Sequence, residues 1–132
     1  MPDENPAEKE DTTHARAVEQ HYDELDWFYE DAWGENLHHG LWRTGKEGSE
    51  EAVENLRDLI AQQAEISAGD TVCDIGCGYG AAARHWAATY RALATGITLS
   101  GKQWEKAKLR AERIGASTPP PRFLHGDWLD NS

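Results

Sequence analysis

Large apolar side chains recur every three or four positions along the first half of the chain, a spacing that predicts amphipathic helices. In residues 14–33 these positions gather tyrosine, phenylalanine and tryptophan on one helical face, with a break expected near Asp26 that would divide the segment into two helices. A second helical pattern begins at Ser49, which is followed by two glutamates suited to a helix N-terminus, and continues to Ala64. We therefore expect the chain to start with helices.

After residue 70 the pattern changes to short runs of apolar and β-branched residues separated by helix-forming segments. The runs that predict strands are 71–75, 92–99 and 122–125, and the first is apolar enough for a buried parallel strand. Between them, the alanine-rich segment 81–88 and the segment 102–114, capped by Ser100 and closed by Gly115, predict helices. Strands that alternate with helices indicate a parallel sheet with right-handed crossovers, and therefore an α/β doubly wound fold.

Composition narrows the range of partners. The 132 residues include 13 Lys and Arg against 24 Asp and Glu, a formal net charge of −11, so neither nucleic acid nor an anionic membrane surface is an expected partner. No apolar run approaches the roughly 20 residues that cross a bilayer. Residues 1–13 are acidic and polar, unlike a secretory signal, and we expect a disordered acidic tail there and a cytoplasmic location.

The two cysteines carry neither a metal-site nor a disulfide signal. Cys73 and Cys77 lie four residues apart, without a CxxC pair or a second Cys/His cluster at zinc spacing. Both are expected to be small buried residues in a reducing compartment, and no metal site is predicted.

The segment from Asp74 to Gly80 is the strongest candidate for chemistry. Ligands of parallel α/β sheets bind beyond the carboxyl ends of strands, where Gly76, Gly78 and Gly80 are placed here. Glycine lets the backbone turn sharply and approach a ligand because it has no Cβ. The spacing also satisfies the loose dinucleotide pattern, but residues 94–100 contain no acid to hold ribose hydroxyls, and Asp74 would repel a pyrophosphate. A carboxylate there suits a ligand with a cationic part.

The residues of this loop are, in order, Asp74-Ile75-Gly76-Cys77-Gly78-Tyr79-Gly80. Their sequence strongly resembles motif I of the class I S-adenosylmethionine-dependent methyltransferases. In that family the acid helps to orient the amino group of the ligand, and the glycines pass under its methionine portion. The resemblance therefore implies S-adenosyl-L-methionine as the cofactor. It implies that the cofactor is held in this loop by Asp74, Gly76, Cys77, Gly78 and Gly80.

The resemblance continues downstream of the loop. Gly96-Ile97-Thr98-Leu99-Ser100, followed by Gln103, looks like the second-strand signature of one branch of the family. That branch contains cyclopropane fatty acid synthases, tocopherol methyltransferases and coclaurine-type N-methyltransferases. By family position Thr98, Leu99 and Gln103 would line the ribose and adenine side of the cofactor. Asp127 and Trp128, after the third strand, would lie near the adenine.

Upstream, His21-Tyr22-Asp23 and the segment 37–42 are similar to the N-terminal lid of the same branch. The similarity implies that His38 and His39 bind the cofactor, although two adjacent histidines are equally compatible with an ordinary surface loop. The aromatic residues nearby are expected mainly to pack the helices onto the sheet, with an aromatic cage for a cationic amine as the alternative. These residues are Trp27, Phe28, Trp33 and Trp42.

The resemblance implies a methyltransferase that acts on N, C or O of a small molecule or lipid, present here as its cofactor-binding N-terminal portion. Residues 1–13 would be the tail, 14–66 a helical lid segment, and 67–132 the first half of a Rossmann-like domain with strands in the order 3-2-1. The family's catalytic residues would lie beyond Ser132, so none is assigned.

Two alternatives stay open: a non-catalytic S-adenosylmethionine-binding module or inert fragment, and, less favoured, an NAD-binding oxidoreductase domain. With three strands in the order 3-2-1, the first strand would lack the neighbour that the resembled family places on its other side. Such an exposed strand edge favours self-association.

Overall fold

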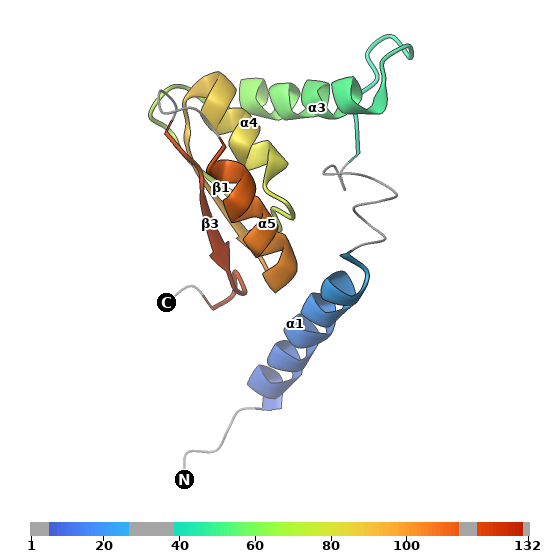
Figure 1. The fold of residues 1–132 in the computed structure, drawn as a ribbon, viewed down its shortest axis with the longest axis vertical. Coiled ribbons are helices and arrows are strands. Elements are labelled where there is room, and N and C mark those ends of the chain that lie inside the picture. Colours follow the sequence, from blue (N-terminus) through green and yellow to red (C-terminus); the bar gives the residue numbers. More distant parts are fainter. Residues whose placement is uncertain (1–5, 27–38, 114–118, 131–132) are drawn as a thin grey trace.

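The computed structural model describes residues 6–26, 39–113 and 119–130, and its elements follow the predicted order (Figure 1). Its helices are α1 (Pro6–Glu24), α3 (Ser49–Gln63), α4 (Ala81–Tyr90) and α5 (Gly101–Ala111). Its strands are β1 (Thr71–Ile75), β2 (Leu93–Thr98) and β3 (Arg122–His125). The three predicted strands and the two helices between them are confirmed, with small differences at their ends.

Helix α1 begins inside the segment that was expected to be a disordered tail. The structure therefore has helix from Pro6 onward, within the range 1–13 for which the sequence predicted a tail. Proline suits the first turn of a helix because its missing N–H has no partner there, and acidic residues such as those that follow it are favoured near a helix N-terminus. The helix ends at Glu24, close to the break expected at Asp26.

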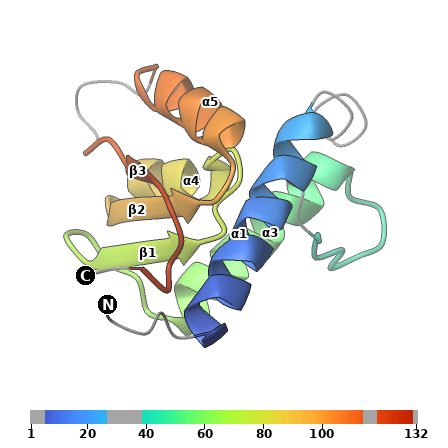
Figure 2. The same cartoon turned by 90° about the horizontal axis from the view of Figure 1, so that it is seen from below.

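The three strands form one parallel sheet in the order β1-β2-β3, as expected. Thr95 of β2 pairs with Cys73 of β1 and with Arg122 of β3, so β2 is central. Both crossover helices pack on the same face, α4 against β1 and β2 and α5 against β2 and β3 (Figure 2). The α/β class is confirmed, and the described residues form a sheet that is covered by crossover helices on one face.

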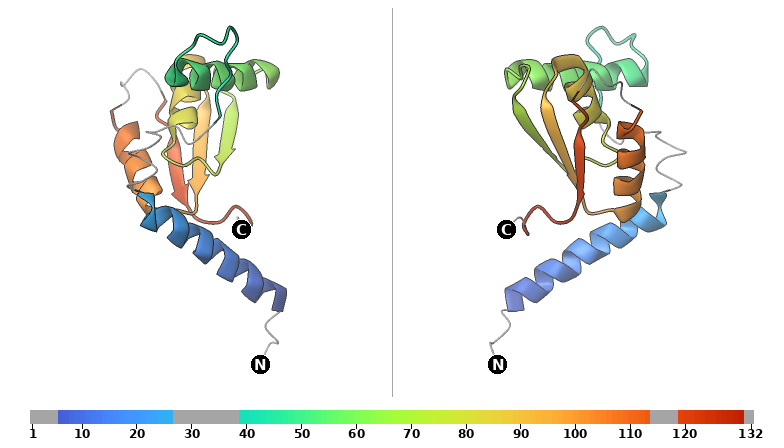
Figure 3. Two further views of the ribbon diagram at one scale, coloured as in Figure 1. Left: turned by 90° about the vertical axis from the view of Figure 1, so that its right-hand side faces the viewer. Right: turned by 60° about the vertical axis from the view of Figure 1, so that its left-hand side comes forward.

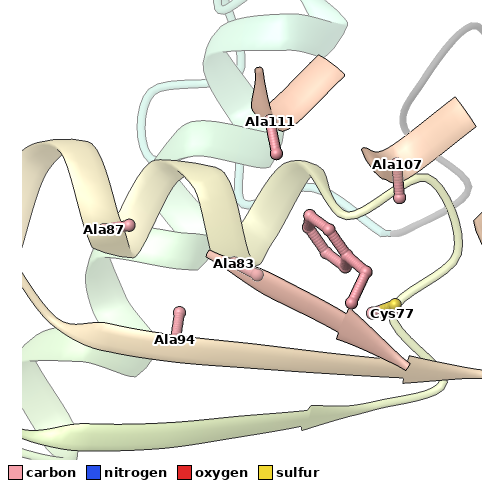
Figure 4. Packing of buried hydrophobic residues seen from close by; sticks show 7 residues of the cluster. Cys77, Ala83, Ala87, Ala94, Ala107 and Ala111 are labelled. Carbon is pink, nitrogen blue, oxygen red and sulfur yellow. The ribbon is translucent and has the colours of Figure 1, made fainter. Parts of the chain in front are cut away.

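The core lies between the sheet and the two crossover helices. These helices face the sheet with alanines, whose small side chains allow a close approach, and Phe123 of β3 fills the space between them. Gly96 of β2 completes the fit, because a Cβ there would lie 2.8 Å from side-chain atoms of Cys77 and Phe123. The buried members of this cluster, most of them labelled in Figure 4, are Cys77, Ala83, Ala87, Ala94, Ala107, Ala111 and Phe123.

The opposite face of the sheet has no covering helix among the described residues. Its side chains include Ile75, Leu93 and Leu124, which are 53%, 49% and 44% exposed. The prediction that residues 71–75 form a buried strand is therefore wrong, since β1 is an edge strand with alternate side chains exposed. An apolar run shows that a strand can be buried, but neighbouring segments decide whether it is.

Candidate functional site

The glycine loop that follows β1 is fixed to β2 by its backbone. The N–H groups of Gly76 and Cys77 both donate to the carbonyl of Ile97 over 2.9 Å, and the N–H of Gly80 donates to the carbonyl of Cys77 over 2.9 Å. Gly76, Gly78 and Gly80 have φ angles of +74°, +55° and +76°, in the left-handed region that disfavours other residues. The sequence thus dictates a tight turn between β1 and α4.

Two of these glycines have different surroundings. A Cβ on Gly80 would lie 2.3 Å from the ring of Phe123, so this position has to be glycine for the core to close. A Cβ on Gly78 would meet nothing within 4 Å, so the backbone there faces open space. Gly80 therefore allows the core to pack closely, whereas the backbone at Gly78 is accessible to a ligand.

A cavity of about 360 Å³ opens beside Gly78 at the carboxyl ends of the strands. Its walls come from the glycine loop, from the segments after β2 and β3, from the first turn of α5 and from α1, which crosses beyond the strand ends (Figure 3). Seven residues predicted from the sequence line it together: Gly76, Gly78, Thr98, Leu99, Gln103, Asp127 and Trp128. Segments far apart in the chain thus converge on one cavity where the resemblance placed a cofactor.

The other predicted site residues lie elsewhere. Asp74 and His39 line a separate cavity of about 260 Å³ between α3 and α4, together with Arg57 and Trp86. The side chain of Cys77 is 1% exposed and belongs to the core cluster. Gly80 also packs against the core, and His38 lies outside the described residues.

The aromatic segment near the lid can be judged at one position only. Trp42 is 50% exposed, and its indole N–H donates to the carbonyl of Glu47 over 3.1 Å, so half of this side chain is in contact with solvent. Trp27, Phe28 and Trp33 lie outside the described residues.

Sequence reasoning missed part of the cavity wall. Val18 and Tyr22 of α1 line the cavity, as does Tyr79 of the glycine loop. Val18 and Tyr22 are one helical turn apart, so the apolar spacing of residues 14–33 did carry a signal for this face. What the spacing could not show is that the face packs across the strand ends and not on the sheet.

Polar contacts fix the side chains at the end of β2. The hydroxyl of Thr98 donates to Gln103 Oε1 over 3.2 Å, and the backbone N–H of Gln103 donates to the hydroxyl of Ser100, the predicted N-cap of α5, over 3.2 Å. All three residues are buried. This part of the wall is therefore set before a ligand arrives.

The loop after β3 is held in a similar way. The N–H of Gly126 donates to the carbonyl of Thr98 over 3.0 Å, and the Asp127 carboxylate accepts from the N–H of Leu129 over 2.9 Å. Asp127 thus places a negative charge in the cavity wall beside the indole of Trp128, which is 44% exposed. The pair offers an acceptor for amino groups and an apolar surface for a flat ring.

Nucleophilic chemistry by the loop cysteine does not fit its surroundings. Burial raises the pKa of the Cys77 thiol to about 12, and the charge of Asp74 adds to this effect. The thiol is therefore neutral at physiological pH. No group of three or more potential metal ligands occurs within residues 6–26, 39–113 and 119–130.

No helix in the described part of the chain is long and apolar enough to cross a membrane.

Comparisons with known proteins agree with this geometry. The family model described as mycolic acid cyclopropane synthetase matches residues 9–128. The 27-O-demethylrifamycin SV methyltransferase of Amycolatopsis mediterranei (strain S699) is 42% identical over 90 residues, which are 68% of this chain and 33% of that protein. A probable chloroplastic tocopherol O-methyltransferase of Oryza sativa subsp. japonica is 32% identical over 118 residues, covering 83% of this chain and 32% of that protein.

A solved structure has a similar fold. The crystal structure of the [4+2]-cyclase SpnF matches with a TM-score of 0.77 and 31% identity, over 86% of this chain and 42% of that one. The chain thus spans about a third of the length of the two enzymes above. Because the family model covers nearly all of its residues, the chain belongs to the mycolic acid cyclopropane synthetase family.

Proposed function

We propose that this chain binds S-adenosylmethionine in the glycine-loop cavity and is the cofactor-binding portion of a methyltransferase for a small molecule or a lipid. The observation that carries the proposal is the convergence of the loops after all three strands on one cavity. The names of the related rifamycin and tocopherol enzymes support the reaction type and the substrate class. The methyl acceptor itself is left open.

The cavity fits this cofactor. Its volume of about 360 Å³ lies within the range of roughly 300–1,000 Å³ that is typical of small-molecule sites. Ile97, Leu99 and Trp128 provide apolar surface for a heterocycle, and Asp127 provides an acceptor for its amino group. The backbone at Gly78 is open to a ligand. The end of β2 carries Thr98 and no acidic residue, which matches the resembled methyltransferase branch. An NAD site would have an acidic residue there.

The proposed chemistry divides between the cofactor and the chain. When bound, the sulfonium supplies an electrophilic methyl group. The chain's part is to bind and orient: Gly76 and Gly78 permit close approach, and Val18 and Tyr22 of α1 exclude water from one side. Cys77 and Gly80 contribute through the shape of the loop, whereas Asp74 and His39 line the neighbouring cavity. No acid or base for the acceptor is assigned.

Calorimetric titration tests the proposal. We expect S-adenosylmethionine and S-adenosylhomocysteine to bind and NAD not to bind. Gly78→Val should abolish binding, because its side chain would occupy the open space of the cavity. Gly45→Val is the matched control, since Gly45 also has a positive φ of 77° and open surroundings but lies outside the cavity wall. Tight NAD binding without a response to the other two ligands would overturn the proposal.

The second candidate is a non-catalytic module that binds S-adenosylmethionine. It is favoured by the cavity wall, to which the described residues contribute groups that bind and orient a ligand. Incubation with S-adenosylmethionine and a panel of amines, phenols and lipids separates the two. Formation of S-adenosylhomocysteine that depends on an acceptor identifies the enzyme, whereas binding without turnover identifies the module.

We also propose two properties of the chain. It self-associates along the outer edge of β1, and it is located in the cytoplasm. No described strand pairs with that edge, and the side chains of Cys73 and Ile75 beside it are exposed. Both cysteines are free, which is consistent with a reducing compartment.

A further inference from the structure

Helix α1 and the turn after it contact the strand ends through acidic residues. Glu19, Asp23 and Asp26 follow one another at intervals of four and three, the spacing that places side chains on one side of a helix. Glu19 contacts the last residue of β3, Asp23 contacts Ser100 just after β2, and Asp26 contacts Tyr79 of the glycine loop that follows β1. Helix α1 crosses beyond the carboxyl ends of the strands, as Figure 3 shows.

Two of these contacts lie near the surface. Glu19 Oε1 is 2.9 Å from Nε2 of His125, the last residue of β3. The Asp23 carboxylate accepts a hydrogen bond from the hydroxyl of Ser100, and the Asp23 carbonyl accepts one from Lys102 Nζ over 2.7 Å. The Glu19–His125 contact joins two exposed side chains and contributes little to stability, whereas the Asp23 bond to Ser100 is partly buried.

The third contact is buried. The Asp26 carboxylate accepts a hydrogen bond from the hydroxyl of Tyr79 over 2.6 Å and another from Lys106 Nζ over 2.7 Å. Asp26 is 7% exposed and Tyr79 is 1% exposed. Burial alone would raise the pKa of Asp26, but the hydrogen bonds from Lys106 and Tyr79 outweigh it, and the net pKa is lowered. The carboxylate is therefore charged at neutral pH.

Tyr79 is also a residue of the glycine loop, between Gly78 and Gly80. Its carbonyl accepts a hydrogen bond from Arg84 Nη1 over 2.6 Å. Lys106 Nζ and Arg110 Cζ lie 5.6 and 5.0 Å from the centre of its ring, within the range of cation–π interactions. Tyr79 thus connects the backbone of the loop to α5 and to the end of α1.

The same end of α1 supplies part of the cavity wall. Tyr22 lies one turn before Asp26 and Val18 one turn further back, and both line the cavity. If Asp26 were released, this wall could move away from the strand ends, and the tyrosine contact in the loop would be lost as well. The conformation of the loop and the position of the wall are therefore linked through one buried hydrogen bond.

We propose that Tyr79 and Asp26 are positioning residues for the cofactor: their hydroxyl–carboxylate contact, completed by Lys106, keeps α1 over the glycine loop so that Val18 and Tyr22 close the cavity. The inference rests on the proposed function, because it assumes that the cavity holds S-adenosylmethionine. Binding and helix position are thermodynamically linked: a ligand that contacts Val18 and Tyr22 must in turn stabilise α1 in the position that closes the cavity.

Tyr79→Phe removes the hydroxyl and keeps the ring. We expect it to weaken S-adenosylhomocysteine binding by about tenfold, the scale of one hydrogen bond to a charged group. Hydrogen exchange supplies a readout that needs no turnover. In the wild type, adding S-adenosylhomocysteine should slow exchange of the amides of residues 18–24, and in Tyr79→Phe this protection should be largely lost.

Tyr90→Phe is the matched control. The hydroxyl of Tyr90 also donates to a carboxylate, Asp58 Oδ1 at 2.9 Å, but Tyr90 is the last residue of α4 and neither residue lines the cavity. It should leave the ligand affinity and the protection of α1 unchanged. At Lys106, whose side chain is one-third exposed, Lys106→Met should reproduce the loss and Lys106→Arg should largely restore binding.

The outcomes separate the inference from the proposed function. If the wild type binds S-adenosylhomocysteine but Tyr79→Phe and Lys106→Met bind it equally well, the inference is overturned and the proposed function stands. If the wild type does not bind it, both fail. If Tyr79→Phe does not fold, as judged by near-UV circular dichroism, the two Lys106 variants decide.

Discussion

Single residues of the glycine loop differ in what they contribute, and their neighbours show how. Gly80→Ala combines a positive φ of 76° with a Cβ 2.3 Å from the Phe123 ring. We expect it to lower the free energy of unfolding by about 2–4 kcal/mol, the sum of left-handed strain and overpacking. Gly78→Ala should cost only about 1–2 kcal/mol because it meets no neighbour. Urea unfolding of the two variants measures the difference.

Equal losses for the two variants would contradict this packing of Phe123. The motif in the sequence marks both glycines as equivalent members of a turn. Their division into a packing position and an open position depends on Phe123, which is 43 positions further along (123 − 80) and reaches the loop only through the sheet. Local sequence therefore predicts the turn but not the separate roles within it.

The two cysteines should differ strongly in reactivity. With a pKa of about 12, Cys77 has a thiolate fraction on the order of one in ten thousand at pH 8, and it is 1% exposed. Cys73 is exposed on the sheet face without a helix, so the expectation that both cysteines are buried is wrong for Cys73. Iodoacetamide at pH 8 should label Cys73 in the native protein and Cys77 only after denaturation, as read by peptide mass spectrometry. Comparable native labelling of both would place Cys77 outside the core.

At the scale of elements, α3 and α4 are joined by one carboxylate. Asp58 of α3 lies 2.7 Å from His85 Nε2 and accepts a hydrogen bond from Tyr90 over 2.9 Å. Partial burial would raise the pKa of Asp58, but the hydrogen bonds from His85 and Tyr90, with the nearby charges of His85 and Arg43, outweigh it and lower the net pKa. These contacts thus stabilise the charged form of the Asp58 carboxylate in the folded state.

Asp58→Asn should therefore lower the free energy of unfolding at pH 7 by about 1 kcal/mol, a modest value because the carboxylate is partly exposed. A lowered pKa in the folded state gives stability that is present above the unfolded value of about 3.9 and is lost as the pH falls below it. The difference between wild type and variant should accordingly shrink below about pH 4. Glu54→Gln, an exposed change on the same helix, should have little effect at any pH.

Whole elements were predicted well where local signals agree. The third strand was predicted with its observed bounds, and Ser100 is the N-cap of α5, because short apolar runs, caps and prolines act within a few residues. The start of α1 was missed because the acidic composition of residues 1–13 was weighed above proline as a helix start. The exposure of β1 was missed because it depends on what covers the sheet.

At the scale of the whole molecule, the sheet is covered on one face only within the described residues. The sequence could predict the order of the strands, because short right-handed crossovers leave few choices. It also predicted seven of the residues in the cavity wall, through motifs that belong to strand ends. The crossing of α1 over these ends was not predictable, since it depends on paired side chains such as Asp26 and Tyr79, 53 positions apart.

The uncovered face and the free edge of β1 make self-association testable. We expect the average mass in sedimentation equilibrium to rise with protein concentration, and to rise further with salt, because a net charge of −11 opposes association and salt screens it. Cys73→Lys places a charge at the middle of the edge strand and should return the mass to that of a monomer. Leu129→Lys, at a position 68% exposed outside the sheet, should change little. A mass independent of concentration at every salt level would show that the β1 edge does not pair in solution.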